Sequence, residues 1–367
     1  MIYNDLQKNI TEVRNLWDYL AVADKPIVLY GMGDGALKIL RELNSRDISV
    51  SGIFASDEFV RGQSFLGMKV KTLSEIEQEL DDFIILLCFG SKLPSVVDRI
   101  KSISAKHELY APDVPVAGDD LFTYEYFCEH LGKFQQSFDL LADDYSKKVF
   151  INIINYKISG KLDFLFNCQT NPEEIYNNFF QVSGEESFLD LGAYDGDTVV
   201  HFIERAKTFR NIIAVEADPK NFKKLERNLQ NLNLNQIECH NVGIWDCDTT
   251  LGFNPQASRN SGIQQDNSPK SGVKGDRELV CRSVDSIVDG REVSYIKIDI
   301  EGAEEQALRG AKETIQKFFP KMNVAVYHKT SDLYLLPLLV HNINSDYKIY
   351  LRHDPCVPAW EINLFFV

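Results

Sequence analysis

The sequence predicts an α/β protein built from two units of alternating strands and helices, joined by a helical connector. Three observations support this fold class: short buried-strand patterns alternate with helical patterns in residues 20–120, the same alternation returns after Ser187, and the stretch between them lacks strands. Strands that alternate with helices favour parallel sheets covered on both faces, so each unit is expected to be Rossmann-like. The expected domains are residues 1–120, 121–180 and 181–367.

The N-terminal unit opens with a strand pattern that runs into a glycine turn. Residues 26–31 read PIVLYG, and the turn GMGDGA leads into the helical pattern LKILRELNS. Gly31, Gly33 and Ala36 fit the G-x-G-x-x-A spacing, but Asp57 lies farther along than the usual acid of dinucleotide-binding turns. NAD(P), a nucleotide-sugar or no ligand at all therefore stay open for this unit. A strand, a helix and a second strand are expected at 48–54, 73–80 and 83–89.

The connector differs from both units in its sequence pattern. Its aromatic-rich helical patterns occupy residues 121–131, 134–141 and 147–158, and Pro172 opens a further helix, PEEIYNNFF. No strand alternation interrupts them, so this segment is expected to pack as helices between the two units.

Strand and helix patterns alternate again in the C-terminal unit. Strands are expected at 188–192, 212–217, 237–245, 295–299, 323–328, 347–353 and 361–367. Helices are expected at 197–206, 219–232 and 304–319. The Gly/Ser/Asn/Pro-rich stretch 254–276 reads as a long loop of the kind that often serves as a lid.

Composition excludes several classes of function. Lys and Arg number 39 against 54 Asp and Glu, which gives a net charge of −15 and no basic cluster that could displace counterions from nucleic acid or bind an anionic membrane. The seven cysteines are scattered and never spaced as C-x-x-C, which indicates free thiols in a reducing compartment. No apolar run reaches the length of a membrane span, and the N-terminus lacks a signal-peptide pattern, so a cytoplasmic location is expected.

The strongest chemical signal is the segment DLGAYDGDT, residues 190–198, between a predicted strand and a predicted helix. Gly192 and Gly196 are expected to let the backbone approach a bound small molecule, since a Cβ there would collide with it. The helix that begins near Asp197 offers unpaired N–H groups to an anionic group. The spacing D-x-G-x-x-x-G differs from the dinucleotide fingerprint. The alternative is that the glycines only form a tight turn.

Glu216 ends the next predicted strand, twenty residues after Gly196. A carboxylate there can accept both hydroxyls of a ribose, and Asp190 is placed to interact with an ammonium group through backbone or water. No phosphate-binding Lys or Arg lies nearby. The combination suits a nucleoside that carries an amino acid, which indicates S-adenosylmethionine as the cofactor.

Residues 172–367 resemble the FkbM-type family of S-adenosylmethionine-dependent methyltransferases. The resemblance rests on PEEIYNNFF, FLDLGAYDGDT, AVEADP, YIKIDIEGAEEQALRGA and AVYHK. It implies a seven-stranded class I methyltransferase sheet with an antiparallel last strand, and O-methylation of sugar or natural-product hydroxyls. The family's ligand-binding positions match Asp190, Gly192 and Glu216. The full set of expected cofactor-binding residues is Asp190, Gly192, Ala193, Gly196, Asp197, Glu216, Asn241 and Val242.

The methyl acceptor is expected beyond the carboxyl ends of the strands. His328 is the expected general base, because a neutral imidazole can remove a hydroxyl proton near neutral pH, with Asp299 or Glu301 positioning the acceptor. Alternatively His328 only bonds a neighbouring loop, the two acids cap the helix near Ala303, and Lys297 neutralises Asp299.

Three further residues or groups carry weaker expectations. His353 is a lesser candidate at the same edge, and Trp245 is a candidate to stack on adenine. No metal is expected, although Mg²⁺ held by Asp299, Glu301 and the histidines stays open as the alternative.

The expected function is therefore an O-methyltransferase whose partner is a small-molecule or glycan acceptor. Nucleic acid and membrane insertion are not expected, and a homodimer is left open. The alternatives are an NAD(P)-dependent oxidoreductase that uses the N-terminal glycine turn, and a non-catalytic binding module with a methyltransferase fold.

Overall fold

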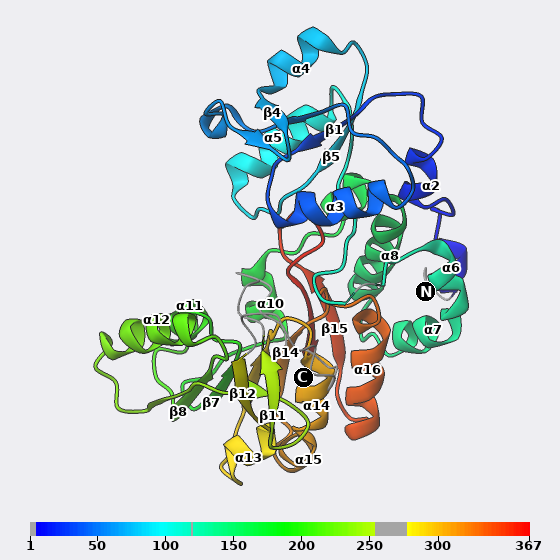
Figure 1. Ribbon diagram of the computed structural model, residues 1–367. Coiled ribbons are helices and arrows are strands. Elements are labelled where there is room, and N and C mark those ends of the chain that lie inside the picture. The colour runs from blue at the N-terminus through cyan, green and yellow to red at the C-terminus, as the bar shows by residue number, and fades with distance from the viewer. Residues whose placement is uncertain (1–4, 119, 254–276) are drawn as a thin grey trace.

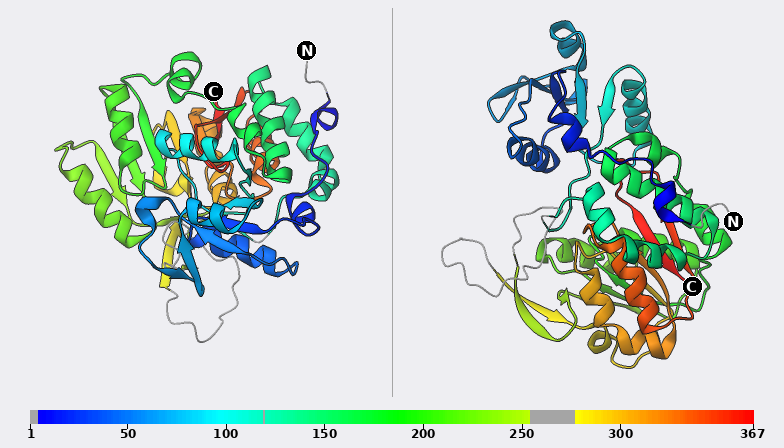
Figure 2. Two further views of the ribbon diagram at one scale, coloured as in Figure 1. Left: turned by 90° about the horizontal axis from the view of Figure 1, so that it is seen from above. Right: turned by 90° about the vertical axis from the view of Figure 1, so that its right-hand side faces the viewer.

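A computed structural model describes residues 5–118, 120–253 and 277–367 (Figure 1). It shows two α/β units, one above the other in this view, with a group of helices alongside (Figures 1 and 2). The predicted lid at 254–276 lies outside the described residues.

The N-terminal unit is a six-stranded sheet in the order β3-β4-β2-β1-β5-β6, in which only β3 runs antiparallel to its neighbour. Its strands are β1 (Ile27–Tyr30), β2 (Gly52–Phe54), β3 (Ser64–Phe65), β4 (Met68–Lys71), β5 (Ile84–Leu87) and β6 (Glu108–Tyr110). Its helices are α2 (Leu16–Leu20), α3 (Asp34–Asn44), the short η1 (Asp57–Phe59), α4 (Leu73–Glu79) and α5 (Pro94–Ser104). Every residue of β1 and β5 is buried, as their unbroken apolar sequences require in a sheet covered on both faces.

The connector is helical, as predicted, and lies along the C-terminal unit. Its helices are α6 (Tyr124–Glu129), α7 (Leu131–Asp139), α8 (Asp144–Ser159), α9 (Leu162–Phe166) and α10 (Pro172–Asn178), and α1 (Leu6–Asn9) packs on α7. The connector also pairs with a strand of the C-terminal sheet, through single bridges from Leu141 to Ile349 and from Gln169 to His353.

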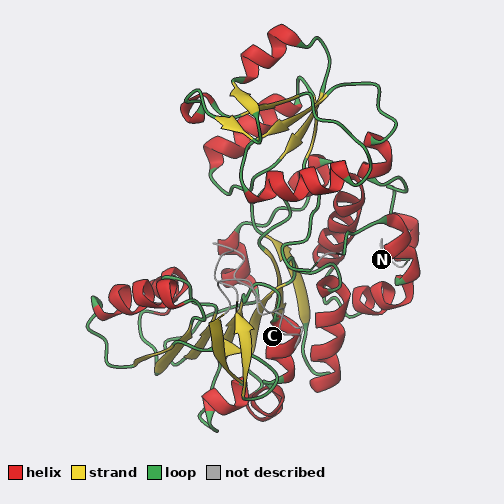
Figure 3. Ribbon diagram, in the orientation of Figure 1, coloured by secondary structure: helices red, strands yellow, loops and turns green. Residues whose placement is uncertain are grey.

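The C-terminal unit is a seven-stranded sheet in the order β15-β16-β14-β13-β7-β8-β9. It lies in the lower part of Figure 3, where strands are yellow and helices red. Its strands are β7 (Ser187–Leu191), β8 (Asn211–Val215), β9 (Ile237–His240), β13 (Tyr295–Ile298), β14 (Lys321–Ala325), β15 (Ile349–His353) and β16 (Ile362–Phe366). The last strand, β16, runs antiparallel to both of its neighbours, which confirms the predicted fold class. Its helices are α11 (Asp197–Ala206), α12 (Pro219–Gln230), α13 (Val284–Val288), α14 (Glu304–Arg309), α15 (Lys312–Phe318) and α16 (Asp332–Ile343).

Local sequence explains where several helices begin. Thr72 and Glu75 form a reciprocal capping box at α4. Asp218 caps α12 by accepting hydrogen bonds from two backbone N–H groups, and Pro219 occupies the first helical position, where its missing N–H costs nothing. The cap holds Asp218 directly behind the end of β8, next to the candidate site described below.

Two predicted elements are divided in the structure. The predicted strand 237–245 splits into β9 and β10 (Gly243–Ile244), and β10 belongs to a separate three-stranded sheet with β11 (Thr249–Phe253) and β12 (Arg277–Arg282). The predicted helix 304–319 is interrupted at Gly310, where a Cβ would lie 2.4 Å from the Trp245 carbonyl oxygen. Both breaks come from close packing between distant segments, which the local patterns do not contain.

One apolar cluster spans both units, and separate buried clusters lie within the N-terminal unit and the C-terminal unit. A single cluster of buried residues includes Tyr30 of the N-terminal sheet, Phe134 and Phe150 of the connector, and Ile296 and Leu364 of the C-terminal sheet. The two units are therefore joined by a packed interior. All seven cysteines are free thiols, and among the described residues no helix combines the length and apolar character needed to cross a bilayer.

Candidate active site

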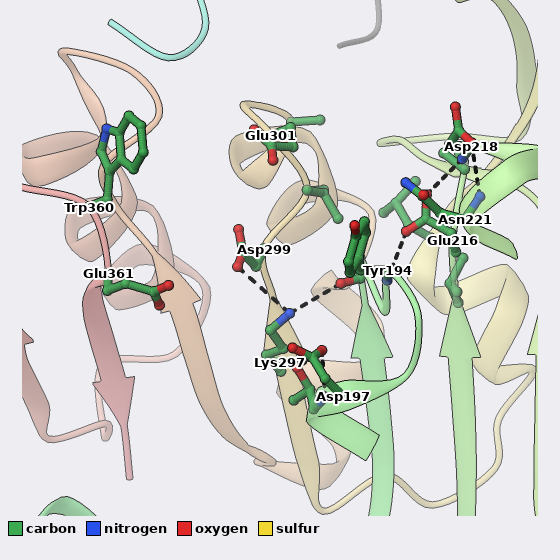
Figure 4. Close-up of a pocket in the computed structure, with 18 of the residues that line it drawn as sticks. Tyr194, Asp197, Glu216, Asp218, Asn221, Lys297, Asp299, Glu301, Trp360 and Glu361 are labelled. Carbon is green, nitrogen blue, oxygen red and sulfur yellow. Dashed lines mark hydrogen bonds and ion pairs between the residues drawn. The ribbon is translucent and has the colours of Figure 1, made fainter. Parts of the chain in front are cut away.

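A cleft of about 500 Å³ lies at the carboxyl ends of the C-terminal strands (Figure 4). Its lining comes from the segments after β7, β8 and β13 and, across from them, from Gly90, Ser91 and Lys92 after β5 of the N-terminal unit. Ser91 forms an antiparallel bridge with Val357, which fixes the N-terminal loop against the segment before β16. The carboxyl ends of both sheets therefore face one cavity, which is where α/β proteins bind ligands.

The glycine turn after β7 forms one wall. Gly192, Asp197 and Thr198 line the cleft, whereas Ala193 and Gly196 lie in the turn and do not line it. The predicted approach of the glycines to a ligand stays a prediction, and the structure adds a second reason for them: a Cβ on Gly192 would meet the Asp299 carbonyl oxygen at 1.9 Å, and one on Gly196 would meet the Leu225 side chain at 3.1 Å. The protein's own packing, together with positive φ values of 84° and 93°, requires glycine at both positions.

Asp190 lies beneath this wall. Its side chain is fully buried, and neither carboxylate oxygen has a hydrogen-bond partner among the described residues. Burial raises the pKa of Asp190 to about 6. Its nearest cation is the Lys297 ammonium, 3.5 Å away, which also donates a hydrogen bond to the Gly192 carbonyl oxygen. Asp190 thus supports the turn through Lys297 and has no direct access to the cleft.

Glu216 ends β8 and faces the cleft. Its carboxylate accepts hydrogen bonds from the backbone N–H groups of Tyr194 (2.9 Å) and Asp218 (2.8 Å), and burial raises its pKa to about 7. Asn241 does not line the cleft but donates to the Glu216 carbonyl oxygen at 2.8 Å, whereas Val242 does line it. The structure therefore brings the predicted turn, acid and apolar wall into one site.

The predicted acceptor residues meet on the other side of the turn. Asp299 and Glu301 line the cleft, and in Figure 4 they lie between Trp360 and Glu216. His328 is fully buried behind them, with its Nε2 3.5 Å from Asp299 Oδ1 and 3.6 Å from Glu301 Oε2. On its far side, Nδ1 lies 2.9 Å from Oε1 of the buried Glu304.

The protonation state of His328 depends on its carboxylate neighbours. Burial alone would lower the pKa of His328, but the Glu304, Asp299 and Glu301 carboxylates raise it to about 10. The three carboxylates therefore favour the protonated imidazole, and His328 does not line the cleft. Its role as the general base stays a prediction.

Other candidate residues lie elsewhere. His353 is fully buried at the end of β15, where burial lowers its pKa to about 4, and it does not line the cleft. Trp245 packs on Leu279 and Cys281 of the small sheet and does not line the cleft, so its stacking on adenine stays a prediction.

The N-terminal glycine turn is tightly packed at Gly31, whereas Gly33 is exposed and has nothing within 4 Å of a Cβ position. A Cβ on Gly31 would meet the Phe89 ring at 2.5 Å, and Lys38 donates hydrogen bonds to the carbonyl oxygens of Pro115 and Val116. Asp57 lines a separate hollow of about 390 Å³, which Gly31 and Gly33 do not share.

The sequence analysis missed the wall that the N-terminal unit completes. Trp360 lines the cleft beside Gly90, where a Cβ would lie 2.2 Å from the indole, and Lys92 pairs with Glu361 at 3.5 Å. One signal was available: Gly90 to Lys92 directly follow a predicted parallel strand, and ligands bind at that end of such strands. The contact with Trp360, 270 residues away, had no local signal.

Comparisons with known proteins agree with this geometry. Residues 190–341 match the family described as the methyltransferase FkbM domain. A search of curated proteins finds no match. Among solved structures, the chain is similar to a methyltransferase FkbM from Methylobacillus flagellatus KT, with a TM-score of 0.71 and 21% identity over 94% of this chain and 90% of that one. It is also similar to an rRNA methylase from Streptococcus thermophilus, with a TM-score of 0.34 and 10% identity over 54% of this chain and 96% of that one. The first likeness supports the fold, and the segment that matches the family model runs from Asp190 on β7 into α16.

Proposed function

We propose that this protein is an S-adenosylmethionine-dependent O-methyltransferase that acts on a hydroxyl of a sugar, glycan precursor or related natural product. The observation that carries the proposal is the shared cleft: the turn after β7, Glu216 after β8 and the acids after β13 all line it. A nucleoside and a polar acceptor can therefore lie side by side between these walls.

The residues fit the cofactor. Glu216 has two backbone donors and retains acceptor capacity for ribose hydroxyls, and Val242 offers an apolar surface to a base. Asn241 holds the Glu216 backbone, while Asp190, Ala193 and Gly196 shape the turn. Gly192 and Asp197 line the end of the cleft nearest α11, where unpaired N–H groups suit a carboxylate.

When bound, S-adenosylmethionine supplies an electrophilic methyl carbon on a sulfonium. The chain's task is then to align the acceptor oxygen and to remove its proton. Asp299 is better placed than His328 to accept that proton, because its carboxylate lines the cleft and the surrounding carboxylates favour the protonated imidazole. His328 is a positioning residue that holds Asp299 and Glu301 from behind, and Trp360 offers an aromatic face to a sugar ring.

The experiment is calorimetric titration of the purified chain with S-adenosylhomocysteine, then with NAD⁺ and NADP⁺. Micromolar binding of the first is expected, with a loss of at least tenfold in Glu216→Gln. Glu204→Gln is the matched control, since Glu204 is an exposed carboxylate on α11 away from the cleft. Binding of a nicotinamide nucleotide in place of S-adenosylhomocysteine would overturn the proposal and favour the oxidoreductase alternative.

A further inference from the structure

Four side chains meet behind the acceptor end of the cleft and form what we call the His328 cluster: His328, Asp299, Glu301 and Glu304. Asp299 and Glu301 follow β13, Glu304 opens α14, and His328 follows β14. Donor atoms of Asp299, Glu304 and His328 all lie within 4.8 Å of one another. The fold thus gathers three carboxylates around one imidazole at the edge of a cavity.

The imidazole is fixed in orientation from its buried side. Glu304 Oε1 lies 2.9 Å from Nδ1 and also accepts hydrogen bonds from the Ile300 and Gly302 backbone N–H groups, at 2.9 and 3.3 Å. This carboxylate cannot turn away without leaving two N–H groups unpaired. The other ring nitrogen, Nε2, must therefore face Asp299 and Glu301.

Neither ring nitrogen has a hydrogen-bond partner of normal geometry among the described residues, although His328 is fully buried and Nδ1 lies 2.9 Å from Glu304 Oε1. Nε2 lies 3.5 Å from Asp299 Oδ1 and 3.6 Å from Glu301 Oε2, at or beyond the upper limit of a hydrogen bond. A buried polar atom that is aimed between two carboxylates and bonded to neither indicates a missing partner.

Charge points to the same conclusion. Besides the three carboxylates of the cluster, the side chain of Asp332 of α16 is buried nearby and accepts a hydrogen bond from the Lys329 backbone N–H. The cations near the cluster are the imidazole when protonated, Lys297, 3.8 Å from Asp299, Lys38, which acts on Glu301, and Lys329, which acts on Asp332. Within the cluster itself three carboxylates surround one imidazole, and buried charges of this kind are normally paired or bound to a metal.

We propose that the His328 cluster is a divalent-cation site in which His328 Nε2 and the Asp299 and Glu301 carboxylates are the ligands. Glu304 is the outer carboxylate that orients the imidazole, as is usual for metal-bound histidines. Two carboxylates and one imidazole suit Mn²⁺ or Mg²⁺. The cleft leaves the remaining positions open to oxygen ligands.

The inference deepens the proposed function and, for its catalytic meaning, rests on it. Asp299 and Glu301 line the same cavity as Glu216, so a cation on them would lie beside the acceptor. A hydroxyl bound to a divalent cation loses its proton more readily. The cation would replace the proton on His328 Nε2 and leave the other Asp299 oxygen free to accept the hydroxyl proton.

The test is a titration of the full chain with Mn²⁺, without cofactor or acceptor, in which the electron paramagnetic resonance signal of the free ion reports binding. One saturable site is expected, weakened at least tenfold in Asp299→Asn and in His328→Gln, and displaced by excess Mg²⁺. Asp98→Asn is the matched control for adventitious binding, because Asp98 is an exposed carboxylate on α5.

Thermal unfolding of each variant precedes the titration. Asp299 is 30% exposed and its replacement by Asn keeps the side-chain shape, so this variant keeps the test informative if His328→Gln fails to fold. Absence of saturable binding, or equal affinity in wild type and Asp299→Asn, overturns the cation site. The S-adenosylhomocysteine titration fails or succeeds independently, which separates failure of the cation site from failure of the proposed function.

Discussion

At the residue scale, the candidate site depends on carboxyl groups whose charged form is disfavoured by burial. Burial raises the pKa of Glu216 to about 7 although two backbone N–H groups favour its charged form. The group is thus protonated below about pH 7 and ionised above it. A carboxylate accepts hydrogen bonds from ribose hydroxyls more strongly than a carboxylic acid does, so the protonation state of Glu216 should control cofactor affinity.

We therefore expect the affinity for S-adenosylhomocysteine to fall about five- to tenfold between pH 8 and pH 6, which corresponds to about 1 kcal/mol for a charge-assisted hydrogen bond. Calorimetric titrations at several pH values measure this change in affinity. Asp190, with a pKa of about 6, adds a second effect only at the acidic end. Glu216→Gln should show a much flatter pH dependence over pH 6 to 8, and an equally steep one would assign the effect to another group.

The sequence could predict the positions of these residues only where a local pattern of strands and turns defines them. Asp190, Gly192 and Glu216 follow strands at fixed spacing, and the structure places them together around one turn. The protonation of His328 could not be predicted from a local pattern, because Glu304 and Asp299, which raise its pKa, come from another strand-to-helix turn. A side chain's protonation state is a property of its neighbours in space.

At the element scale, the turn between β7 and α11 is held by its packing on β13. A Cβ on Gly192 would lie 1.9 Å from the Asp299 carbonyl oxygen. The backbone of the cofactor wall and that of the acceptor wall are thus in direct contact, and a change at Gly192 should disturb both.

Gly192→Ala should lower the free energy of unfolding by about 2–5 kcal/mol, the sum of left-handed strain and overpacking. Gly67→Ala is the matched control, since Gly67 has a similar φ of 82° and open space at the Cβ position; it should lose only about 1–2 kcal/mol. Urea denaturation measures both. Equal losses in the two variants would show that the contact with Asp299 contributes nothing.

Elements with a strong hydrophobic periodicity were predictable from the sequence. Elements whose bounds depend on packing against distant segments were not. The apolar runs of β1, β5 and β7 predicted buried parallel strands, which the structure has. The division between β9 and β10 depends on Gly243, where a Cβ would lie 2.7 Å from Cys281 Sγ of β12. That contact joins segments separated by residues 254–276, so no local pattern shows it.

At the scale of the whole molecule, the domains predicted at 1–120, 121–180 and 181–367 stay a prediction, but the packing bears on how independent they are. The connector covers one edge of the C-terminal sheet. Ala142 N–H donates to the Ile349 carbonyl oxygen at 2.8 Å, and Thr170 N–H donates to that of His353 at 2.7 Å. The Ser146 hydroxyl accepts from Leu351 N–H at 3.0 Å. These bonds pair an edge strand that would otherwise expose its backbone groups.

A fragment of residues 181–367 should therefore lose cooperative folding or self-associate, because it exposes the edge of β15 and the apolar surface that the connector buries. Circular dichroism during heating and size-exclusion chromatography measure the two outcomes. A fragment of residues 121–367 is the matched comparison, since it retains the hydrogen bonds from Ala142, Ser146 and Thr170 and should unfold cooperatively as a smaller, less stable protein. A monomeric 181–367 fragment with the thermal stability of the full chain would show that the C-terminal unit folds without the connector. In that case the continuous core would join the units without stabilising the sheet that carries the site.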